Sequence, residues 1–593
     1  HPGSLGPSTA YTQARILEVY DPERLRTPMR MDDTDLKPNA IHNEQNWEAL
    51  YGYAQPLLTA KDLSSVAFLS EQISSPSLMK IKKQLEDKGA RWFVYASINS
   101  DNQLAGSRLA FGKPWRPHYQ FDQAKIILTI DADPLQMDPN GIANVGGFAK
   151  KRDPDEEKMS RLYAVESQFT HTGAAADHRI SVTSTDMAGF VGSLAAAIDA
   201  ASGKIDAKLP YLEKMLACMA QDLADHKGEG MIICGERQPA AVHAAVHALN
   251  DKLGNHGKTI LWTELPESDT HNHQQAIQDF VNGDFKTVVI VGGNPVYTAP
   301  HELNIKDKLK AVSNTIYLGQ YRNETARCCK WIGNPSHQLE TWGDGYAYDG
   351  SVCLSQPMIR PLFNSLSEIE LLSTWMGLPT TDGMTIVKEN SGLSDKDWAQ
   401  SVHDGFVKDS AAKPGSATLA DSVSMPAATD GWRKDWDEST LELVFTPSSS
   451  VYDGRFANNA WLQELPDFLT KLTWDNALLV SPKTYDVLKK SGIRTQMIAN
   501  VKVGDEMVGL PVLIQPGQAD GSLGVAIGYG RTAAGRVGGD GNTGIEPVGV
   551  DVNPLRTAKT WHFVSVQEPT ETGTAYRLAL VQDPWNIDSV GRD

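Results

Sequence analysis

The feature that most constrains this chain is an alternation of apolar strands and amphipathic helices that begins near residue 64. SSVAFLS is a short apolar run bounded by polar residues, which predicts a buried strand. SPSLMKIKKQLEDKG follows with a Ser cap, an early Pro, helically spaced apolar residues and a closing Gly, so it predicts a helix. RWFVYAS and AKIILTIDAD read as further strands. Strands that alternate with helices form parallel sheets covered by helices, and we therefore expect an α/β fold.

A second alternating unit begins near Leu209. Helical patterns there separate the strands EGMIICGE, KTILWTE and KTVVIVGG, although the order of these strands in a sheet cannot be read from the sequence. After Leu441 the character changes to short β-rich runs separated by Gly, Pro and Asp turns, which is typical of a β-barrel. The sequence thus predicts two α/β domains with parallel sheets, followed by a C-terminal β-barrel domain.

These patterns suggest domain boundaries. Proline residues break any long element near the N-terminus, and a stretch rich in Asp, Ser, Ala and Pro reads as a surface linker. The expected ranges are 1–60 for an irregular N-terminal segment, 61–208 for the first α/β domain (completed by 364–440), 209–363 for the second α/β domain, 405–440 for the linker and 441–593 for the barrel.

The charge of the chain excludes some classes of partner. The 593 residues carry a formal net charge of −18, from 55 basic and 73 acidic residues. A sequence-independent nucleic-acid binder needs a basic face, so we expect no nucleic acid as partner. A membrane span needs roughly 18 consecutive apolar residues. The sequence contains no such run, so we expect no membrane span. The acidic balance fits a solvated surface or an acidic face for a basic redox partner.

The five cysteines carry no metal-binding pattern. Cys218, Cys234, Cys328, Cys329 and Cys353 form no CxxC pair and have no His at zinc-finger spacing. We interpret them as small buried hydrophobic residues. A disulfide from Cys353 to Cys328 or Cys329 stays open.

Two glycine-rich segments are candidate binding sites. Gly292, Gly293 and Asn294 follow the apolar strand KTVVIVGG, and glycines at the carboxyl end of a strand let a ligand phosphate approach the backbone. Arg531 and Arg536 lie in a glycine-rich arm and could reach an anion. The alternatives are a tight structural turn for the first segment and glycine-rich barrel corners with solvated arginines for the second.

A polar cluster follows the strand RLYAVESQF. Its polar groups are Thr170, His171, Thr172, Asp177, His178 and Arg179, and His171, Asp177 and His178 could bind a metal or move protons. We favour the alternative that they form a hydrogen-bonded connection between a strand and a helix. The chain contains no GxSxG, Walker A, HExxH or EF-hand pattern.

Several segments, taken in order, resemble the molybdopterin oxidoreductase superfamily, and one branch of it more closely. That branch is the large iron–sulfur subunit of alternative complex III, a bacterial membrane-bound quinol:electron-acceptor oxidoreductase. The resemblance covers essentially the whole chain. The segments that carry it are LYAVESQFTHTGAAADHRI, VVIVGGNPVYTAP, SHQLETWGDGYAYDGSVCLSQPMIRPLF, NNAWLQELPDFLTKLTWDNALLVSP and RVGGDGNTGIEPVGVDVNPL.

The N-terminus departs from the active members of this superfamily. HPGSLGPSTAYTQARILEVYDPER resembles the end of their N-terminal iron–sulfur domain, where a Cys normally provides the last cluster ligand. Here the run Gly6–Ala10 contains no Cys. The resemblance therefore makes 1–60 a remnant of a cluster domain, and we expect further sequence of the subunit to lie outside this chain. No local pattern nominates a molybdenum ligand among Ser167, Thr170 and Asp177.

The resemblance implies a non-catalytic scaffold within an electron-transfer complex. It implies no metal and no molybdopterin in this chain, so that Gly292, Gly293, Asn294, Arg531 and Arg536 are candidates only for a vestigial pterin site. Clusters of the [4Fe-4S] and [3Fe-4S] type belong to an adjoining ferredoxin-like domain, and haem c belongs to a multi-haem cytochrome c subunit. The other implied partners are quinol-oxidising integral membrane subunits, and the implied location is the periplasmic side of the bacterial inner membrane.

Two other functions stay open at this point. The chain could be the catalytic subunit of an active molybdopterin-dependent oxidoreductase whose cluster domain lies upstream, in which case the same five residues would contact the pterin nucleotides. It could also be a general α/β binding protein. We disfavour the latter because the resemblance extends through the C-terminal barrel.

Overall fold

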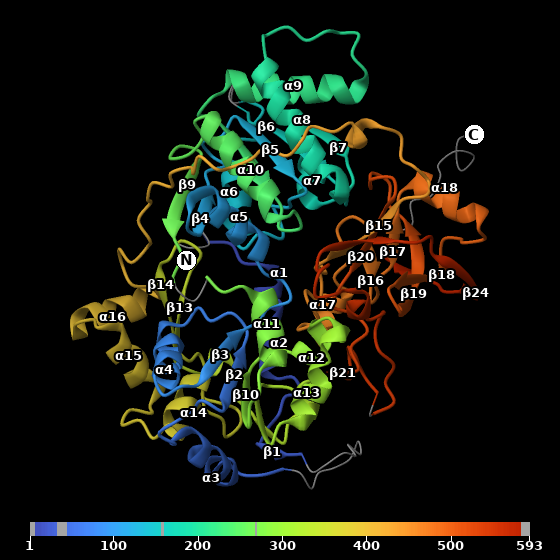
Figure 1. The fold of residues 1–593 in the computed structure, drawn as a ribbon. Helices are drawn as coiled ribbons and strands as arrows, with labels where there is room; N and C mark the ends of the chain where they lie inside the picture. Colours follow the sequence, from blue (N-terminus) through green and yellow to red (C-terminus); the bar gives the residue numbers. More distant parts are fainter. Residues whose placement is uncertain (1–5, 32–43, 156–158, 267–269, 542, 583–593) are drawn as a thin grey trace.

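The structure, a computed structural model, describes residues 6–31, 44–155, 159–266, 270–541 and 543–582. Figure 1 shows three lobes. A six-stranded sheet with its helices lies at the lower left, a four-stranded sheet with its helices lies at the top, and a curled mixed sheet lies on the right.

The six-stranded sheet has the order β1-β12-β11-β10-β2-β3. Its strands run parallel except for β1, which pairs antiparallel with β12. Apolar β-branched residues dominate the central strands, as expected for strands buried on both faces. The strands are β1 (Met29–Arg30), β2 (Val66–Ser70), β3 (Arg91–Val94), β10 (Thr287–Val291), β11 (Asn314–Leu318) and β12 (Trp331–Gly333).

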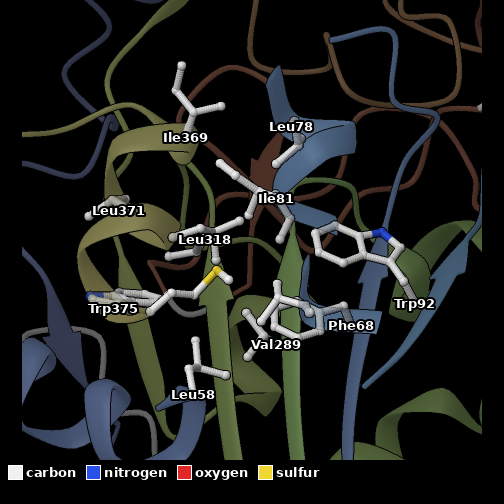
Figure 2. Close-up of a cluster of buried hydrophobic side chains, with 14 of the residues drawn as sticks. Leu58, Phe68, Leu78, Ile81, Trp92, Val289, Leu318, Ile369, Leu371 and Trp375 are labelled. Carbon is white, nitrogen blue, oxygen red and sulfur yellow. The ribbon is translucent and has the colours of Figure 1, made fainter. Parts of the chain in front are cut away.

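Side chains of this sheet alternate between two helical layers. Phe68, Val289 and Leu318 point to the layer shown in Figure 2, where Ile81 and Trp375 meet them from the helices. The intervening strand residues face the other layer. The first layer is formed by α3 (Trp47–Leu58), α4 (Pro76–Glu86), α14 (Glu368–Trp375) and α15 (Gly383–Ser391), and the second by α11 (His273–Asn282) and α13 (Ile305–Ala311).

The four-stranded sheet has the order β7-β6-β5-β8, and all its strands are parallel. Its strands are β5 (Ile126–Ile130), β6 (Arg161–Glu166), β7 (His178–Ser181) and β8 (Gly230–Cys234). One face is covered by α8 (Met187–Ala200), α9 (Tyr211–Asp225) and α10 (Ala240–Lys252). The other face meets α6 (Gly141–Ala149) and the antiparallel pair β4 (Trp115–Tyr119) and β9 (Ile260–Glu264).

The two sheets divide the chain differently from the expected ranges. β2 and β3 lie beside β10, whereas β5 lies beside β8, so both 61–208 and 209–363 contribute strands to both sheets. The four-stranded lobe is an insertion between β3 and β10 that starts with α5 (Asp101–Phe111). The physical reason is the full-length pairing of β10 with β2, with Thr287 opposite Val66. Local periodicity identifies strands but does not encode such a distant pairing.

The C-terminal lobe is a half-barrel of seven strands in the order β23-β15-β20-β17-β19-β18-β24. Apolar side chains such as Leu443, Val512 and Val525 fill its concave core. Two helices, α17 (Ala460–Glu464) and α18 (Pro482–Lys490), accompany it. The strands are β15 (Leu441–Thr446), β17 (Leu478–Val480), β18 (Met497–Val503), β19 (Glu506–Ile514), β20 (Ser522–Ala526), β23 (Phe563–Val566) and β24 (Thr570–Ala575).

The segment 405–440 joins the six-stranded lobe to the half-barrel and crosses the top lobe on its way (Figure 1). It is packed rather than loose. Trp432 is 4% exposed and its ring lies 5.2 Å from that of Phe190 on α8. Gly192 of the same helix faces the backbone of Pro426 and Ala427 so closely that a Cβ atom would lie 2.5 Å from the Pro426 carbonyl oxygen. Glycine on α8 therefore allows the linker to lie against the helix.

Helix length can be compared with the thickness of a membrane. α9, with 15 residues, would extend over about 22 Å at the usual helical rise. Across the described ranges, no helix is both long enough and apolar enough to span a bilayer.

Candidate functional site

A cavity of about 620 Å³ lies where three parts of the chain meet. The six-stranded sheet contributes the carboxyl ends of β2, β10 and β11, where ligands bind in open α/β sheets. The half-barrel contributes the loop 453–460 and the segment 531–537, and the N-terminal segment contributes residues 15–23. The cavity is therefore a junction between lobes as well as a pocket.

The structure brings all five sequence-predicted residues to this cavity. Gly292, Gly293 and Asn294 form the turn after β10, and Arg531 and Arg536 reach it from the half-barrel. Their positions in the sequence are far apart, and only the packing of the half-barrel against the sheet makes them neighbours. The charge partners of these residues show whether their polar groups are free to bind a cofactor.

The glycine turn has a structural requirement of its own. Gly292 and Gly293 both adopt positive φ angles, 70° and 72°, a region that side chains other than glycine rarely enter. A Cβ atom on Gly293 would also lie 2.9 Å from Cγ of Glu71. The turn then leads into α12 (Pro295–Thr298).

Arg531 is fully engaged with the protein. Its Nη2 lies 2.7 Å from Oε2 of Glu324, its Nε lies 3.0 Å from Oε1, and its Nη1 donates to the Gly454 carbonyl oxygen at 2.6 Å. Asn294 donates its Nδ2 to the same Glu324 carboxylate at 2.7 Å. Although burial opposes ionisation, Arg531 lowers the pKa of Glu324 to about 2. The pair is therefore charged and internally neutralised.

A second arginine of the cavity is held by two carboxylates. Arg455 Nη2 lies 2.7 Å from Asp453 Oδ2 and 2.7 Å from Glu71 Oε1. Glu71 follows β2, so this contact joins the half-barrel to the sheet. Burial raises the pKa of Glu71, an effect that Arg455 opposes.

The remaining two arginines pair with the N-terminal segment. Arg536 Nε lies 2.7 Å from Glu23 Oε1 at the exposed rim, and Arg15 Nε lies 3.0 Å from Glu18 Oε2. The segment is anchored by α1 (Ala10–Ala14), whose N-cap Thr9 accepts from the Thr12 amide. Within the run Gly6–Ala10, the position where a cluster ligand is expected in relatives thus serves as a helix start. His1–Leu5 lie outside the described residues.

Glu368 is one of the carboxylates that line the cavity. It is the first residue of α14, and in the part of the chain that the structure describes its side chain neither accepts a hydrogen bond nor forms an ion pair. Burial, reinforced by the negative charge of Glu71, raises the pKa of Glu368 to about 7. This carboxyl consequently holds its proton to a higher pH than an ordinary glutamate does.

Sequence reasoning missed Glu324, Asp453, Arg455 and Glu368. Glu324 lies in the distinctive stretch NETARCCKW, and Asp453-Gly454-Arg455 is a charged triplet around a glycine. Neither pattern specifies a cavity. Their roles depend on contacts between lobes, which leave no local signal.

The polar cluster after β6 does not converge on a reaction centre. His171 stacks on Phe468 at 4.5 Å, Asp177 pairs with Arg152 at 2.8 Å, and His178 stacks on Tyr163 at 5.2 Å. Thr170 caps α7 (His171–Ala175) and also binds Glu166. These contacts are those of a hydrogen-bonded connection. Over the described ranges no group of three or more His, Cys, Asp or Glu residues could hold a metal ion.

All five cysteines are free thiols. Cys234 and Cys329 are buried, and Cys218, Cys328 and Cys353 are partly buried. The disulfide left open by the sequence, from Cys353 to Cys328 or Cys329, is not formed.

The residues of the cavity do not fit an anionic pterin nucleotide. Phosphate groups are held by free guanidinium, ammonium or backbone N–H donors. Here each of the four arginines already has a carboxylate partner. The lining also holds more carboxylates than arginines, and these would repel a phosphate.

Comparison with solved structures defines the class of fold. The chain has a molybdopterin-oxidoreductase-like fold, with two parallel α/β sheets and a curled sheet. One matching structure is acetylene hydratase from Pelobacter acetylenicus, with 14% sequence identity, a TM-score of 0.66 and coverage of 93% of each chain. No protein-family model and no curated protein matches the chain. The similarity establishes the fold that the sequence predicts.

Proposed function

We propose that this chain is a non-catalytic scaffold, the molybdopterin-like part of the iron–sulfur subunit of an alternative complex III. In this function it binds neither molybdenum nor pterin. Quinol is oxidised at integral membrane subunits, and electrons pass through [4Fe-4S] and [3Fe-4S] clusters of an adjoining ferredoxin-like domain to haem c of a cytochrome subunit. The chain holds these parts in position on the periplasmic side of the inner membrane.

The observation that carries this proposal is the pairing of the cavity arginines. A cofactor site has to keep its positive groups available for the cofactor phosphates. Arg531 is instead neutralised by Glu324, and Arg455 by Asp453 and Glu71. These contacts hold the half-barrel against the sheet without a ligand, which is the property required of a rigid scaffold.

A second candidate is an active molybdopterin-dependent oxidoreductase. It is favoured by the convergence of Gly292, Gly293, Asn294, Arg531 and Arg536 on one cavity at the strand ends of a fold shared with such enzymes. In this case Arg531 would have to exchange Glu324 for a phosphate. The desolvated Glu324 carboxylate would then be left without its partner, at a considerable cost.

Elemental analysis separates the two candidates. The full chain, isolated with the complex in which it occurs, is analysed for Mo and W, and released pterin is measured by its fluorescence. The scaffold predicts neither metal and no pterin, with iron accounted for by the partner domain and subunits. Near-stoichiometric Mo or W together with pterin would overturn it and support the catalytic subunit.

A further inference from the structure

The cavity has a chemistry that differs from that of a phosphate site. We infer that it binds a small organic cation, such as a primary amine or polyamine, with the Glu368 carboxylate as its principal anchor and Glu71 beside it. This inference rests on the proposed function only in that the cavity must be free of pterin. The ligand it assigns to the cavity is cationic, whereas a pterin nucleotide is anionic.

The lining of the cavity carries more negative than positive side chains. Four guanidiniums and six carboxylates face the cavity, and the guanidinium of Arg531 is further neutralised by Glu324 behind it. A low-dielectric pocket with excess negative charge concentrates cations and repels anions. The carboxylates are Glu18, Asp21, Glu23, Glu71, Glu368 and Asp453.

The cavity wall offers more free hydrogen-bond acceptors than free donors. The donors of the cavity are largely in use: Asn294 donates to Glu324, Asn323 donates to Gly293, and Asn458 donates to Asp21. Tyr317 donates its hydroxyl to the Gly293 carbonyl oxygen at 2.9 Å. Arg536 lies at the exposed rim, and farther in the wall retains acceptor capacity at Glu368. A ligand that matches it has to bring N–H groups.

Glu368 is the acceptor with the most unused hydrogen-bonding capacity on the cavity wall. Within the described residues its carboxyl accepts no hydrogen bond, although it lines the cavity. The side chain is half-buried, and a partly desolvated carboxylate of this kind gains a charge-assisted hydrogen bond when an ammonium group binds. Glu71 cannot fill this need because it is itself acidic and already pairs with Arg455.

Aromatic side chains complete the site. Tyr297, Tyr317 and Phe456 line the same cavity. Arg531 already lies over the Tyr297 ring at 5.0 Å and Phe456 stacks on Tyr11 at 5.2 Å, so these rings supply apolar surface for the methylene stem of an amine. A ligand with an ammonium head and a short apolar chain therefore satisfies both parts of the lining.

Calorimetric titration of the purified full chain tests the inference. Spermidine and agmatine are the cationic probes, and GMP and pyrophosphate are the anionic probes. We expect binding of at least one amine, with affinity reduced about tenfold or more in Glu368→Gln, because a charge-assisted hydrogen bond contributes about 1.5–3 kcal/mol. Glu368→Asp retains the charge and should retain part of the affinity. Glu389→Gln, an exposed change on α15, should bind like the wild type.

The outcomes separate this inference from the proposed function. Amine binding that is equal in the wild type and in Glu368→Gln, or no amine binding at all, would overturn the cation site but leave a metal-free, pterin-free scaffold intact. Binding of GMP or pyrophosphate in place of amines would overturn it as well. Mo or W with pterin in the isolated chain would instead contradict the scaffold. Melting curves of each variant show that lost binding is not lost folding.

Discussion

Nη2 of Arg531 lies 2.7 Å from Oε2 of Glu324, and this contact joins the half-barrel to the six-stranded lobe at the wall of the cavity. Both side chains are nearly inaccessible, with 6% and 11% exposure. A pair in this position combines two functions. It fixes how the lobes sit against each other, and it removes the positive charge that a nucleotide cofactor would use.

The first prediction concerns this pair. Glu324→Gln leaves the Arg531 guanidinium buried and uncompensated, and we expect a loss of about 3–5 kcal/mol in the free energy of unfolding. Arg531→Met should cost a similar amount. The double variant should cost less than the sum of the two, which a double-mutant cycle in urea would measure.

A surface pair provides the control for that cycle. Lys125 and Glu229 lie 2.8 Å apart but are about half exposed, so Glu229→Gln should leave the denaturation midpoint unchanged. Strictly additive costs for Glu324→Gln and Arg531→Met would contradict a coupled pair.

The second prediction concerns three buried histidines, His243 and His247 on α10 and His256 beside Trp262. Burial lowers the pKa of His243 and of His256 to about 4, and it lowers the pKa of His247 further. An unfolded chain takes up protons on these residues below about pH 6.5, whereas the folded chain keeps them neutral until near pH 4. Their contribution to stability is therefore complete above pH 6.5 and is lost as the pH falls.

Comparison of the wild type with His247→Phe isolates this effect. The His247 ring packs against both Phe111 and Trp262, 5.2 Å from each ring centroid, so phenylalanine should fit there. We expect the variant to lose less stability between about pH 6.5 and 4, by up to about 1.4 kcal/mol per pH unit. Parallel stability–pH curves would contradict the prediction.

The third prediction concerns Glu368 and has the opposite sign. Burial and Glu71 raise its pKa to about 7, so the folded chain binds a proton that the unfolded chain has already released above about pH 4.5. The ionised carboxyl therefore destabilises the fold as the pH rises toward 7 and beyond. Glu368→Gln should stabilise the protein at about pH 8 by on the order of 1 kcal/mol, after discounting for water in the cavity, and have little effect at about pH 5. Thermal unfolding of both proteins in the absence of amines, at both pH values, measures the difference. Equal melting-temperature shifts at the two pH values would contradict it.

The fourth prediction concerns the linker over α8. In Gly192→Ala the new methyl group would lie 2.5 Å from the Pro426 carbonyl oxygen, a backbone atom that cannot move without displacing the linker. We expect a cost of about 1–3 kcal/mol and faster tryptic cleavage at Arg433 and Lys434. Gly146→Ala is the matched control because its helical position is open, and it should be neutral or stabilising by about 0.5–1 kcal/mol. Identical proteolysis of the two variants would show that the linker does not depend on the contact.

Much of the local structure could be predicted from the sequence. The runs that predict strands at SSVAFLS, RWFVYAS and KTVVIVGG correspond to β2, β3 and β10, because a short apolar run between turn residues has few alternatives to a buried strand. The glycine pair after β10 is also explained locally, since its positive φ angles require glycine.

The grouping of strands could not be predicted in the same way. The ranges 61–208 and 209–363 follow the chain, whereas the sheets exchange strands across that boundary. Pairing of β10 with β2 brings distant segments together, and its free energy comes from backbone hydrogen bonds and shared core residues. A short stretch of sequence carries no information about either contribution.

The sequence by itself thus determined the α/β character, the positions of many strands and helices, the β-rich character of the C-terminal part and the glycine turn that lines the cavity, whereas the expected barrel is a half-barrel in the structure. Only the tertiary structure decided that Glu324 neutralises Arg531, that Arg455 joins Asp453 and Glu71, and that Glu368 lines the cavity. The physical reason is range. Hydrophobic periodicity and backbone conformation act between near neighbours in the chain, while the electrostatic character of a cavity depends on which distant side chains the packed lobes bring within a few ångströms of each other.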